Sequence, residues 1–240
     1  MNRGALGAGL GLVLAATAIS PAQAERRRVP VGIGTANPSV LVATEIAMER
    51  MTREKGHVKA VLKYADDAAV MFAPGPVVAR SYLSGQKEPA LSSQSQTHQV
   101  WMSCDGTLGV TRGGWQQAGG PSGYYVTIWK RQKKGTYRWV LDQGDTLTKP
   151  LEAPEMLSAS VADCPRPSAV PGMPPPVPDQ PIVVEGKSGA AASRGSGRSD
   201  DGTLTWSYVA RPDNSHKLVV SLRKGGEMRD VVSIDFGDRG

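Results

Sequence analysis

The stretch that decides the fold is residues 97–145, which read THQVWMSCDGTLGVTRGGWQQAGGPSGYYVTIWKRQKKGTYRWVLDQGD. It contains four runs of β-strand composition, residues 97–103, 107–116, 123–132 and 136–145. The separators Asp105-Gly106, Ala118–Pro121 and Lys133–Gly135 have turn composition, which favours consecutive antiparallel pairing. Aromatic residues occur on both sides of the third and fourth runs, so both faces of the predicted sheet need cover.

The residues before this meander predict helices that can cover one face. Asn37 is a good N-cap with Pro38 at the first helical position, and apolar residues recur at helical spacing until Gly56. A second helix is expected over 57–64, a strand over 68–72, a short helix over 78–83 and a polar loop over 92–96. The other face must be covered by the C-terminal segment or by a second subunit.

The residues after the meander divide into a linker and a small β segment. Ten of the 18 prolines lie between Pro150 and Pro181, and residues 186–199 are rich in glycine and serine. Residues 150–200 are therefore expected to be a linker with at most a short strand over 182–184. Residues 203–236 contain three alternating runs, 203–211, 217–223 and 229–236, which are marginal alone and are expected to dock onto the first domain.

The N-terminus has the pattern of a secretory signal peptide over residues 1–24. Arg3 gives a positive start, an apolar run follows, and Ala22-Gln23-Ala24 matches a cleavage site. The alternative is a membrane anchor, but the run from Ala5 to Ile19 has 15 residues, fewer than the roughly 20 that span a bilayer. Cleavage lowers the formal charge from +6 to +5. We expect an exported protein, periplasmic or extracellular, with no membrane attachment after cleavage.

Two cysteines are present, Cys104 and Cys164. In an oxidising compartment one disulfide between them is the simplest interpretation, and it would close a loop of 60 residues. The alternative is two free thiols, because sequence does not show whether the two Cα atoms lie within bonding range.

Several kinds of chemistry are not indicated. The three histidines, His57, His98 and His216, and the two distant cysteines have no metal-ligand spacing, so no metal is expected. Gly32-Ile33-Gly34 lacks the third glycine and the preceding strand of a dinucleotide loop, and no other cofactor motif is present. The basic residues are scattered along the chain without an exposed aromatic platform, which argues against nucleic acid.

The strand sequences and the Tyr64–Phe72 stretch resemble those of the nuclear transport factor 2-like superfamily, in its SnoaL-like branch. The motifs are DGTLGVTRGGW over 105–115, GYYVTIWKRQ over 123–132 and GTYRWVLD over 135–142. The resemblance covers about residues 37–146. It implies an α+β fold in which a cone-like, curved antiparallel sheet packs on two or three N-terminal helices and leaves a pocket at its open end. Members of the family include cyclases, dehydratases and isomerases acting on apolar ring substrates, and proteins without known activity.

Where family members are catalytic, a pocket Asp or His moves a proton. The positions that could offer one here are Asp66, Asp67, His98 and Asp142, with Asp67, His98 and Asp142 as the catalytic candidates. Each also has a structural interpretation. The aspartates at 66 and 67 suit a turn or cap, His98 suits a surface or hydrogen-bonded position, and Asp142, in phase with Arg138, suits a salt bridge.

Two tryptophans are candidates for a ligand platform, Trp115 and Trp129, although aromatic residues in a meander are more often core. The leading hypothesis is an exported domain that binds a small apolar molecule without catalysis, as a homodimer. The alternatives are an acid/base lyase or isomerase acting on a small cyclic substrate, and a structural or interaction module. The sequence indicates no particular reaction.

Overall fold

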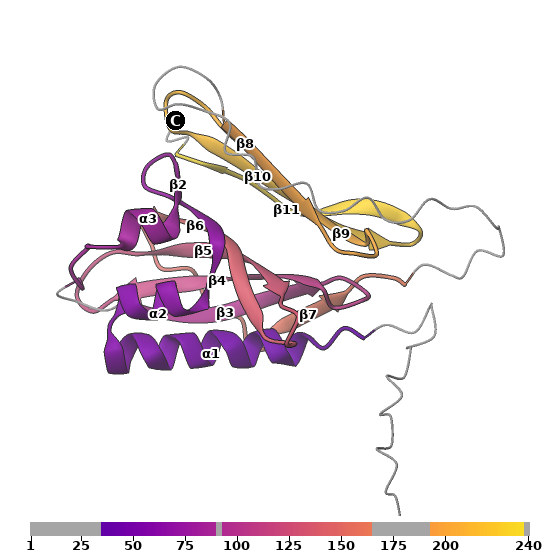
Figure 1. Ribbon diagram of the computed structural model, residues 1–240, viewed down its shortest axis with the longest axis horizontal. Helices are drawn as coiled ribbons and strands as arrows, with labels where there is room; N and C mark the ends of the chain where they lie inside the picture. The colour runs from indigo at the N-terminus through magenta and orange to yellow at the C-terminus, as the bar shows by residue number, and fades with distance from the viewer. Residues whose placement is uncertain (1–34, 90–92, 165–192, 238–240) are drawn as a thin grey trace, which may run out of the picture.

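The computed structural model describes residues 35–89, 93–164 and 193–237, which form three layers (Figure 1). The middle layer is a seven-stranded sheet with strand order β2-β1-β6-β5-β4-β3-β7. Helices lie on one side of this sheet, and a second sheet of order β11-β10-β9-β8 lies on the other side. The α+β class expected from the sequence is confirmed. The predicted signal peptide over 1–24 and the predicted short strand over 182–184 lie outside the described residues.

The helices begin and end where the sequence has capping residues. Helix α1 spans Pro38–Lys55, and the Asn37 side chain accepts a hydrogen bond from the Ser39 backbone N–H at 3.2 Å. Gly56 ends it at φ +104, a conformation that favours glycine. Helix α2 spans His57–Tyr64 and α3 spans Ala79–Leu83.

The large sheet is an antiparallel meander extended at both edges. Its central strands are β3 (Ser93–Met102), β4 (Leu108–Gln117), β5 (Ser122–Arg131) and β6 (Tyr137–Leu147), close to the predicted boundaries. Strand β1 (Ala65–Phe72) pairs parallel with β6 and antiparallel with β2 (Pro76–Val78), and β7 (Ser158–Val161) pairs parallel with β3. The sheet is therefore mixed rather than wholly antiparallel.

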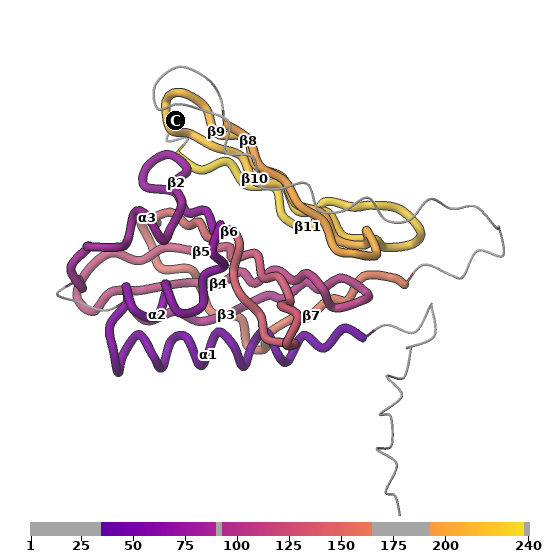
Figure 2. The backbone as a smooth tube through the Cα atoms, viewed as in Figure 1, coloured from indigo at the N-terminus to yellow at the C-terminus, as the bar shows by residue number. Residues whose placement is uncertain are grey.

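The second sheet consists of β8 (Ser193–Arg198), β9 (Leu204–Ala210), β10 (His216–Lys224) and β11 (Glu227–Phe236), which are consecutive antiparallel neighbours. Its apolar face shares one hydrophobic core with the large sheet, including Trp206 and Leu218 on one side and Ile128 and Leu141 on the other. Figure 2 shows these strands lying along the side of the large sheet that the helices do not cover. The C-terminal segment, rather than a second subunit, covers that face.

Two further sequence expectations differ from the structure. The polar loop expected over 92–96 belongs from Ser93 onward to β3. The expected linker over 150–200 contains β7 near its start and β8 near its end. Strand β8 reads Ser-Arg-Gly-Ser-Gly-Arg, which resembles a flexible linker, but its glycines allow close packing. A Cβ added at Gly195 would lie 2.4 Å from the Tyr208 ring, and one at Gly197 would lie 2.7 Å from the Trp206 indole.

Candidate functional site

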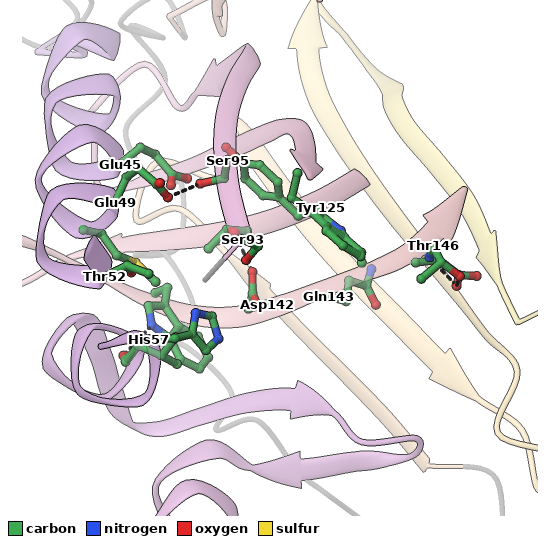
Figure 3. A pocket seen from close by; sticks show the side chains of 17 residues that line it. Glu45, Glu49, Thr52, His57, Ser93, Ser95, Tyr125, Asp142, Gln143 and Thr146 are labelled. Atoms are coloured by element: carbon green, nitrogen blue, oxygen red, sulfur yellow. Dashed lines mark hydrogen bonds between the residues drawn. The ribbon is translucent and has the colours of Figure 1, made fainter. Parts of the chain in front are cut away.

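A cavity of about 490 Å³ lies between α1, the start of α2 and the helix-facing side of β3–β6. Its apolar walls include the rings of Trp115, Tyr125 and Trp139 and the side chains of Met48 and Val61. Its polar groups come from both layers, and Figure 3 shows carboxyl groups of α1 and β6 directed toward the same space. The volume is within the range of pockets that enclose small organic molecules.

Glu45 is the most perturbed acid of the cavity. The Thr111 hydroxyl donates a hydrogen bond to its carboxyl, and the Trp129 indole N–H donates to the Thr111 hydroxyl oxygen at 2.9 Å. The pKa of Glu45 is raised from 4.5 to about 7, chiefly by burial and in smaller part by the nearby charge of Asp142, while the hydrogen bond from Thr111 opposes the rise. Glu45 therefore exchanges a proton near neutral pH.

Asp142 lies on β6, across the cavity from α1. The Thr127 hydroxyl donates to its carboxylate at 2.6 Å. Burial raises the pKa of Asp142, while this hydrogen bond and the positive charge of His57, at the start of α2, lower it. His57 lines the same cavity. Two acids, Glu45 and Asp142, and the imidazole of His57 thus line one cavity.

The face on which Asp142 lies differs from the sequence expectation. Strict alternation places Asp142 with Val140, opposite Trp139. In the structure Ile128 pairs with Leu141 and Trp129 pairs with Trp139, so Val140 is an extra residue on β6. This β-bulge reverses the alternation. Asp142 and Trp139 consequently line the same cavity.

Further hydrogen bonds hold the cavity wall. The Ser95 hydroxyl donates to the Glu49 carboxylate at 2.7 Å, which connects β3 to α1. The hydroxyls of Tyr125 and Thr97 form a hydrogen bond at 2.9 Å. Burial raises the pKa of Tyr125 well above its usual value of 10, so its hydroxyl stays protonated. It can serve as a hydrogen-bond donor or acceptor inside the cavity.

The other catalytic candidates of the sequence lie elsewhere. The side chain of Asp67 is 87% exposed and pairs with Arg80 at 3.0 Å and Arg138 at 3.8 Å. The neighbouring Asp66 caps the backbone N–H of Ala68 at 3.2 Å, as a turn residue does. His98 is buried and lines a separate hollow with Gly114 and Leu151.

The two candidate ligand-binding tryptophans also separate. Trp115 lines the cavity, and its indole N–H donates to the Tyr124 carbonyl at 3.2 Å. Trp129 is fully buried in the core beneath the helices, where it supports Thr111 and Glu45 rather than facing the cavity.

Sequence reasoning missed Glu45, Glu49 and His57. The signal was present for Glu45, which lies one turn after the buried Leu41 and three residues before Met48 on the same helix face. A carboxyl group within an apolar helix stripe is a candidate site residue because burial perturbs its pKa. The actual buried face of α1 contains Leu41 and Thr52, whereas Val40 is exposed.

Within the described part of the chain, no group of three or more acidic, histidine or cysteine side chains is arranged to hold a metal ion. None of the helices in that part has the length and apolar character needed to cross a membrane. The disulfide between Cys104 and Cys164 is present, with the two Cα atoms 5.1 Å apart.

No protein-family model matches the chain, and no curated protein matches its sequence. Solved structures resemble it over about half of its length. A ketosteroid isomerase-like protein from Erwinia carotovora atroseptica is 11% identical, covers 47% of this chain and 97% of its own, and has a TM-score of 0.34. A conserved protein from Planctomyces limnophilus is 13% identical, with 45% and 96% covered and a TM-score of 0.36.

A computationally designed 17-OHP binder is 13% identical, covers 45% of this chain and 94% of its own, and has a TM-score of 0.32. Each of these three structures matches a little under half of this chain and nearly all of its own. Identities and TM-scores this low carry no information about activity.

Proposed function

We propose that the cavity binds a small, largely apolar molecule with a ring system and one basic or hydrogen-bond-donating group. The observation that carries the proposal is the pairing of aromatic walls with carboxyl groups from two layers. Glu45 and Glu49 come from α1, and Asp142 comes from β6. Among the described residues, neither lysine nor arginine lines the cavity, so its polar side chains favour a cationic or neutral ligand over an anionic one.

A matched series of ligands tests this proposal. Indole, tryptamine and indole-3-acetate share one ring system and differ in charge. We expect tryptamine to raise the melting temperature most, indole less, and indole-3-acetate not at all. Equal shifts for the amine and the acid, or no shift with any apolar amine, would overturn the proposal.

Two variants locate the site. Asp142→Asn removes one charge from the cavity, so tryptamine should bind about tenfold more weakly, since a charge-assisted hydrogen bond contributes roughly 1.5–3 kcal/mol. Asp67→Asn, which changes an exposed carboxylate outside the cavity, is the matched control and should leave binding unchanged.

A second candidate function is acid/base isomerisation or lysis of a small cyclic substrate. The observation that favours it is the raised pKa of both Glu45 and Asp142 in one cavity, with Glu45 at about 7. A group that titrates near neutral pH, as Glu45 does, can remove a proton at one carbon and return it at another. Of the three sequence candidates Asp67, His98 and Asp142, two of which would have to converge, only Asp142 lines this cavity, so we propose Glu45 as its partner.

Deuterium exchange separates the two functions. A cyclic ketone with acidic α-hydrogens, incubated with the protein in D₂O, should exchange faster than in buffer if the site is catalytic, and the rate should fall in both Glu45→Gln and Asp142→Asn. Binding of the ketone without faster exchange would exclude the catalytic function and support ligand binding.

We also propose that the protein is exported. The disulfide between Cys104 and Cys164 supports this, because such bonds persist in oxidising compartments. Expression of the full chain followed by cell fractionation and mass analysis of its N-terminal peptide tests it. Mature protein beginning at Glu25 outside the cytoplasm is expected, and an intact N-terminus would contradict it.

A further inference from the structure

Two turns of the chain have the same sequence pattern and the same internal bonds. Residues 103–108 read SCDGTL and residues 199–204 read SDDGTL. In each turn the serine hydroxyl donates to the aspartate carboxylate, at 2.6 Å to Asp105 and 2.7 Å to Asp201. Each carboxylate then accepts the backbone N–H of the threonine two positions later, at 2.9 and 3.0 Å, and the intervening glycine has φ +66 in one turn and +68 in the other.

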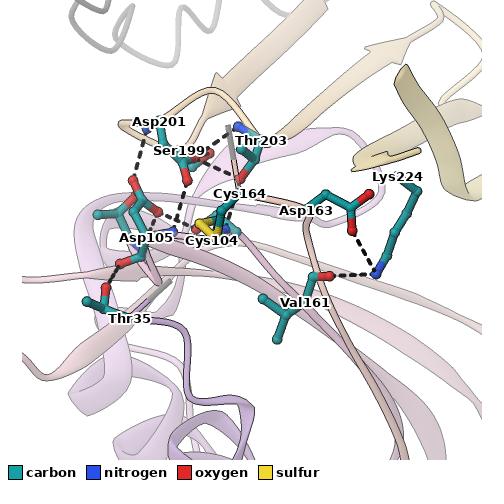
Figure 4. Close-up of a disulfide and its surroundings, with 12 residues drawn as sticks. Thr35, Cys104, Asp105, Val161, Asp163, Cys164, Ser199, Asp201, Thr203 and Lys224 are labelled. Carbon is teal, nitrogen blue, oxygen red and sulfur yellow. Dashed lines mark hydrogen bonds and ion pairs between the residues drawn. A yellow bond between two sulfur atoms is a disulfide. The ribbon is translucent and has the colours of Figure 1, made fainter. Parts of the chain in front are cut away.

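The two turns bond to each other reciprocally (Figure 4). The backbone N–H of Asp105 donates to the Asp201 carboxylate at 2.9 Å, and that of Asp201 donates to the Asp105 carboxylate at 2.9 Å. The backbone N–H of Cys104 donates to the Thr203 hydroxyl at 2.9 Å, and that of Asp200 donates to the Thr107 hydroxyl at 3.0 Å. When residue i of one copy contacts residue j of the other, and residue j of the first contacts residue i of the second, the two copies are related by a twofold axis.

The equivalence continues along the strands that enter and leave the turns. Trp101 pairs with Val110 in β3–β4, and the positions 96 residues later, Gly197 and Trp206, pair in β8–β9. The end of the next strand, β5 in one sheet and β10 in the other, is bonded in the same way. The Arg131 N–H donates to the Thr107 carbonyl and the Arg223 N–H donates to the Thr203 carbonyl, both at 2.8 Å.

The β-bulge also has a counterpart. The register of β5–β6 shifts between Ile128 and Trp129, where Val140 is the extra residue. The register of β10–β11 shifts between Val220 and Ser221, where Val231 is the extra residue. A bulge at the same place in the same pair of strands is a detail that two unrelated four-stranded meanders have no reason to share.

The two faces of the second meander have diverged in different ways. On the face between the sheets, Ile128 and Leu141 correspond to Val220 and Val232, and all four are buried in one core. On the opposite face Trp129 and Trp139, which lie beneath the helices, correspond to Ser221 and Asp230. The Ser221 hydroxyl donates to the exposed Asp230 carboxylate at 2.6 Å. The second meander therefore keeps an apolar face only where it meets the first.

We propose that β8–β11 are an internal copy of the β3–β6 meander and occupy the face on which the meander of a second chain would otherwise pack. The chain thereby supplies its own partner and remains a single-chain protein, in place of the homodimer expected from the sequence. Among the described residues no helix covers the other face of the copy, so that part of the chain has no second counterpart of the cavity beneath the helices.

The molecular mass in solution tests the proposal. Light scattering after size exclusion should give a single-chain mass over a wide concentration range, and a dimer mass would overturn it.

A variant that loosens the second sheet should expose the surface that recognises a second copy. Leu218→Asp places a charge in the core between the sheets, and we expect a folded, concentration-dependent dimer. Val219→Asp, one position along and directed to the other face, is the control and should remain a single chain. A Leu218→Asp protein that is folded but stays single would overturn the proposal. If the aspartate prevents folding, Leu218→Ala tests the same point. This variant should form a dimer at high protein concentration, and a protein that stays single there would overturn the proposal.

Discussion

The strongest quantitative prediction concerns Glu45 and the pH dependence of stability. Its pKa is about 7 in the folded protein and 4.5 without the surrounding structure. Below pH 4.5 the carboxyl is protonated in both states, so the folded state carries no penalty from it. Between pH 4.5 and 7 the folded protein holds a proton that the unfolded chain has lost. The stabilisation associated with that proton is therefore lost as the pH rises through about 7.

The magnitude follows from the size of the shift. Each pKa unit corresponds to about 1.4 kcal/mol, so the shift amounts to about 3 kcal/mol. This is an upper limit, because Glu45 is half-buried and the cavity opens to solvent. We expect about 2 kcal/mol in practice.

Glu45→Gln isolates this contribution, because glutamine keeps the shape of the side chain and stays neutral. Urea unfolding of both proteins from pH 4 to 9 gives the difference in unfolding free energy, in which titrating groups that do not interact with Glu45 cancel. The unfolding free energy of the variant should rise by about 2 kcal/mol relative to that of the wild type between pH 4.5 and 7.5. Above pH 7.5 the difference should stay constant. Glu54→Gln, on the exposed side of the same helix, should show a difference within a few tenths of a kcal/mol. A flat difference curve for Glu45→Gln would refute the reasoning.

Three further predictions concern stability. Cys164→Ser removes a disulfide that closes a loop of 60 residues and should lower the unfolding free energy, measured with urea, by about 4 kcal/mol. Chemical reduction of the wild type should lower it by the same amount, and an unchanged unfolding free energy would contradict the disulfide. Gln143→Met should raise that energy by about 1 kcal/mol, because Gln143 is 3% exposed and neither of its amide atoms has a hydrogen-bond partner in the described part of the chain; a lower melting temperature would show that the amide is paired. Asp105→Ala and Asp201→Ala should each cost about 2 kcal/mol and together less than twice that, since both remove the same reciprocal contact; unequal losses would contradict the twofold relation.

The strand boundaries were predictable because the turns have local signals. Glycine suits turn positions with positive φ, and Gly106, Gly119, Gly135, Gly225 and Gly226 all adopt it. Strand β8 was not predictable in the same way. Its glycines fit under the rings of Tyr208 and Trp206, a requirement that comes from residues distant in sequence. Composition alone cannot distinguish that requirement from flexibility.

The candidate site was predicted in part. Asp142 and Trp115 were identified from the strands and lie in the cavity. Glu45 and His57 were not predicted, because polar residues of an amphipathic helix usually face solvent and only the packing of α1 and α2 against β6 places these two in the cavity. The repeated pattern S-x-D-G-T-L was present in the printed sequence, but one matching hexapeptide does not by itself establish a repeat. The paired registers and the shared bulge establish it, and they appear only in the structure.

The second sheet does not line the cavity, but it can control the position of the cavity residue Asp142. At the β6 bulge two consecutive residues, Val140 and Leu141, both belong to the core between the sheets, whereas Trp139 before them belongs to the core beneath the helices. A strand can direct two successive side chains to one side only at such a bulge. The apolar surface of β9 and β10 stabilises the bulge because it buries the side chains of both Val140 and Leu141. The bulge in turn reverses the alternation of side chains along β6 and directs Asp142 into the cavity. Loss of the second sheet would remove the burial that favours the bulge, so the internal copy and the ligand site are coupled through a single residue of β6.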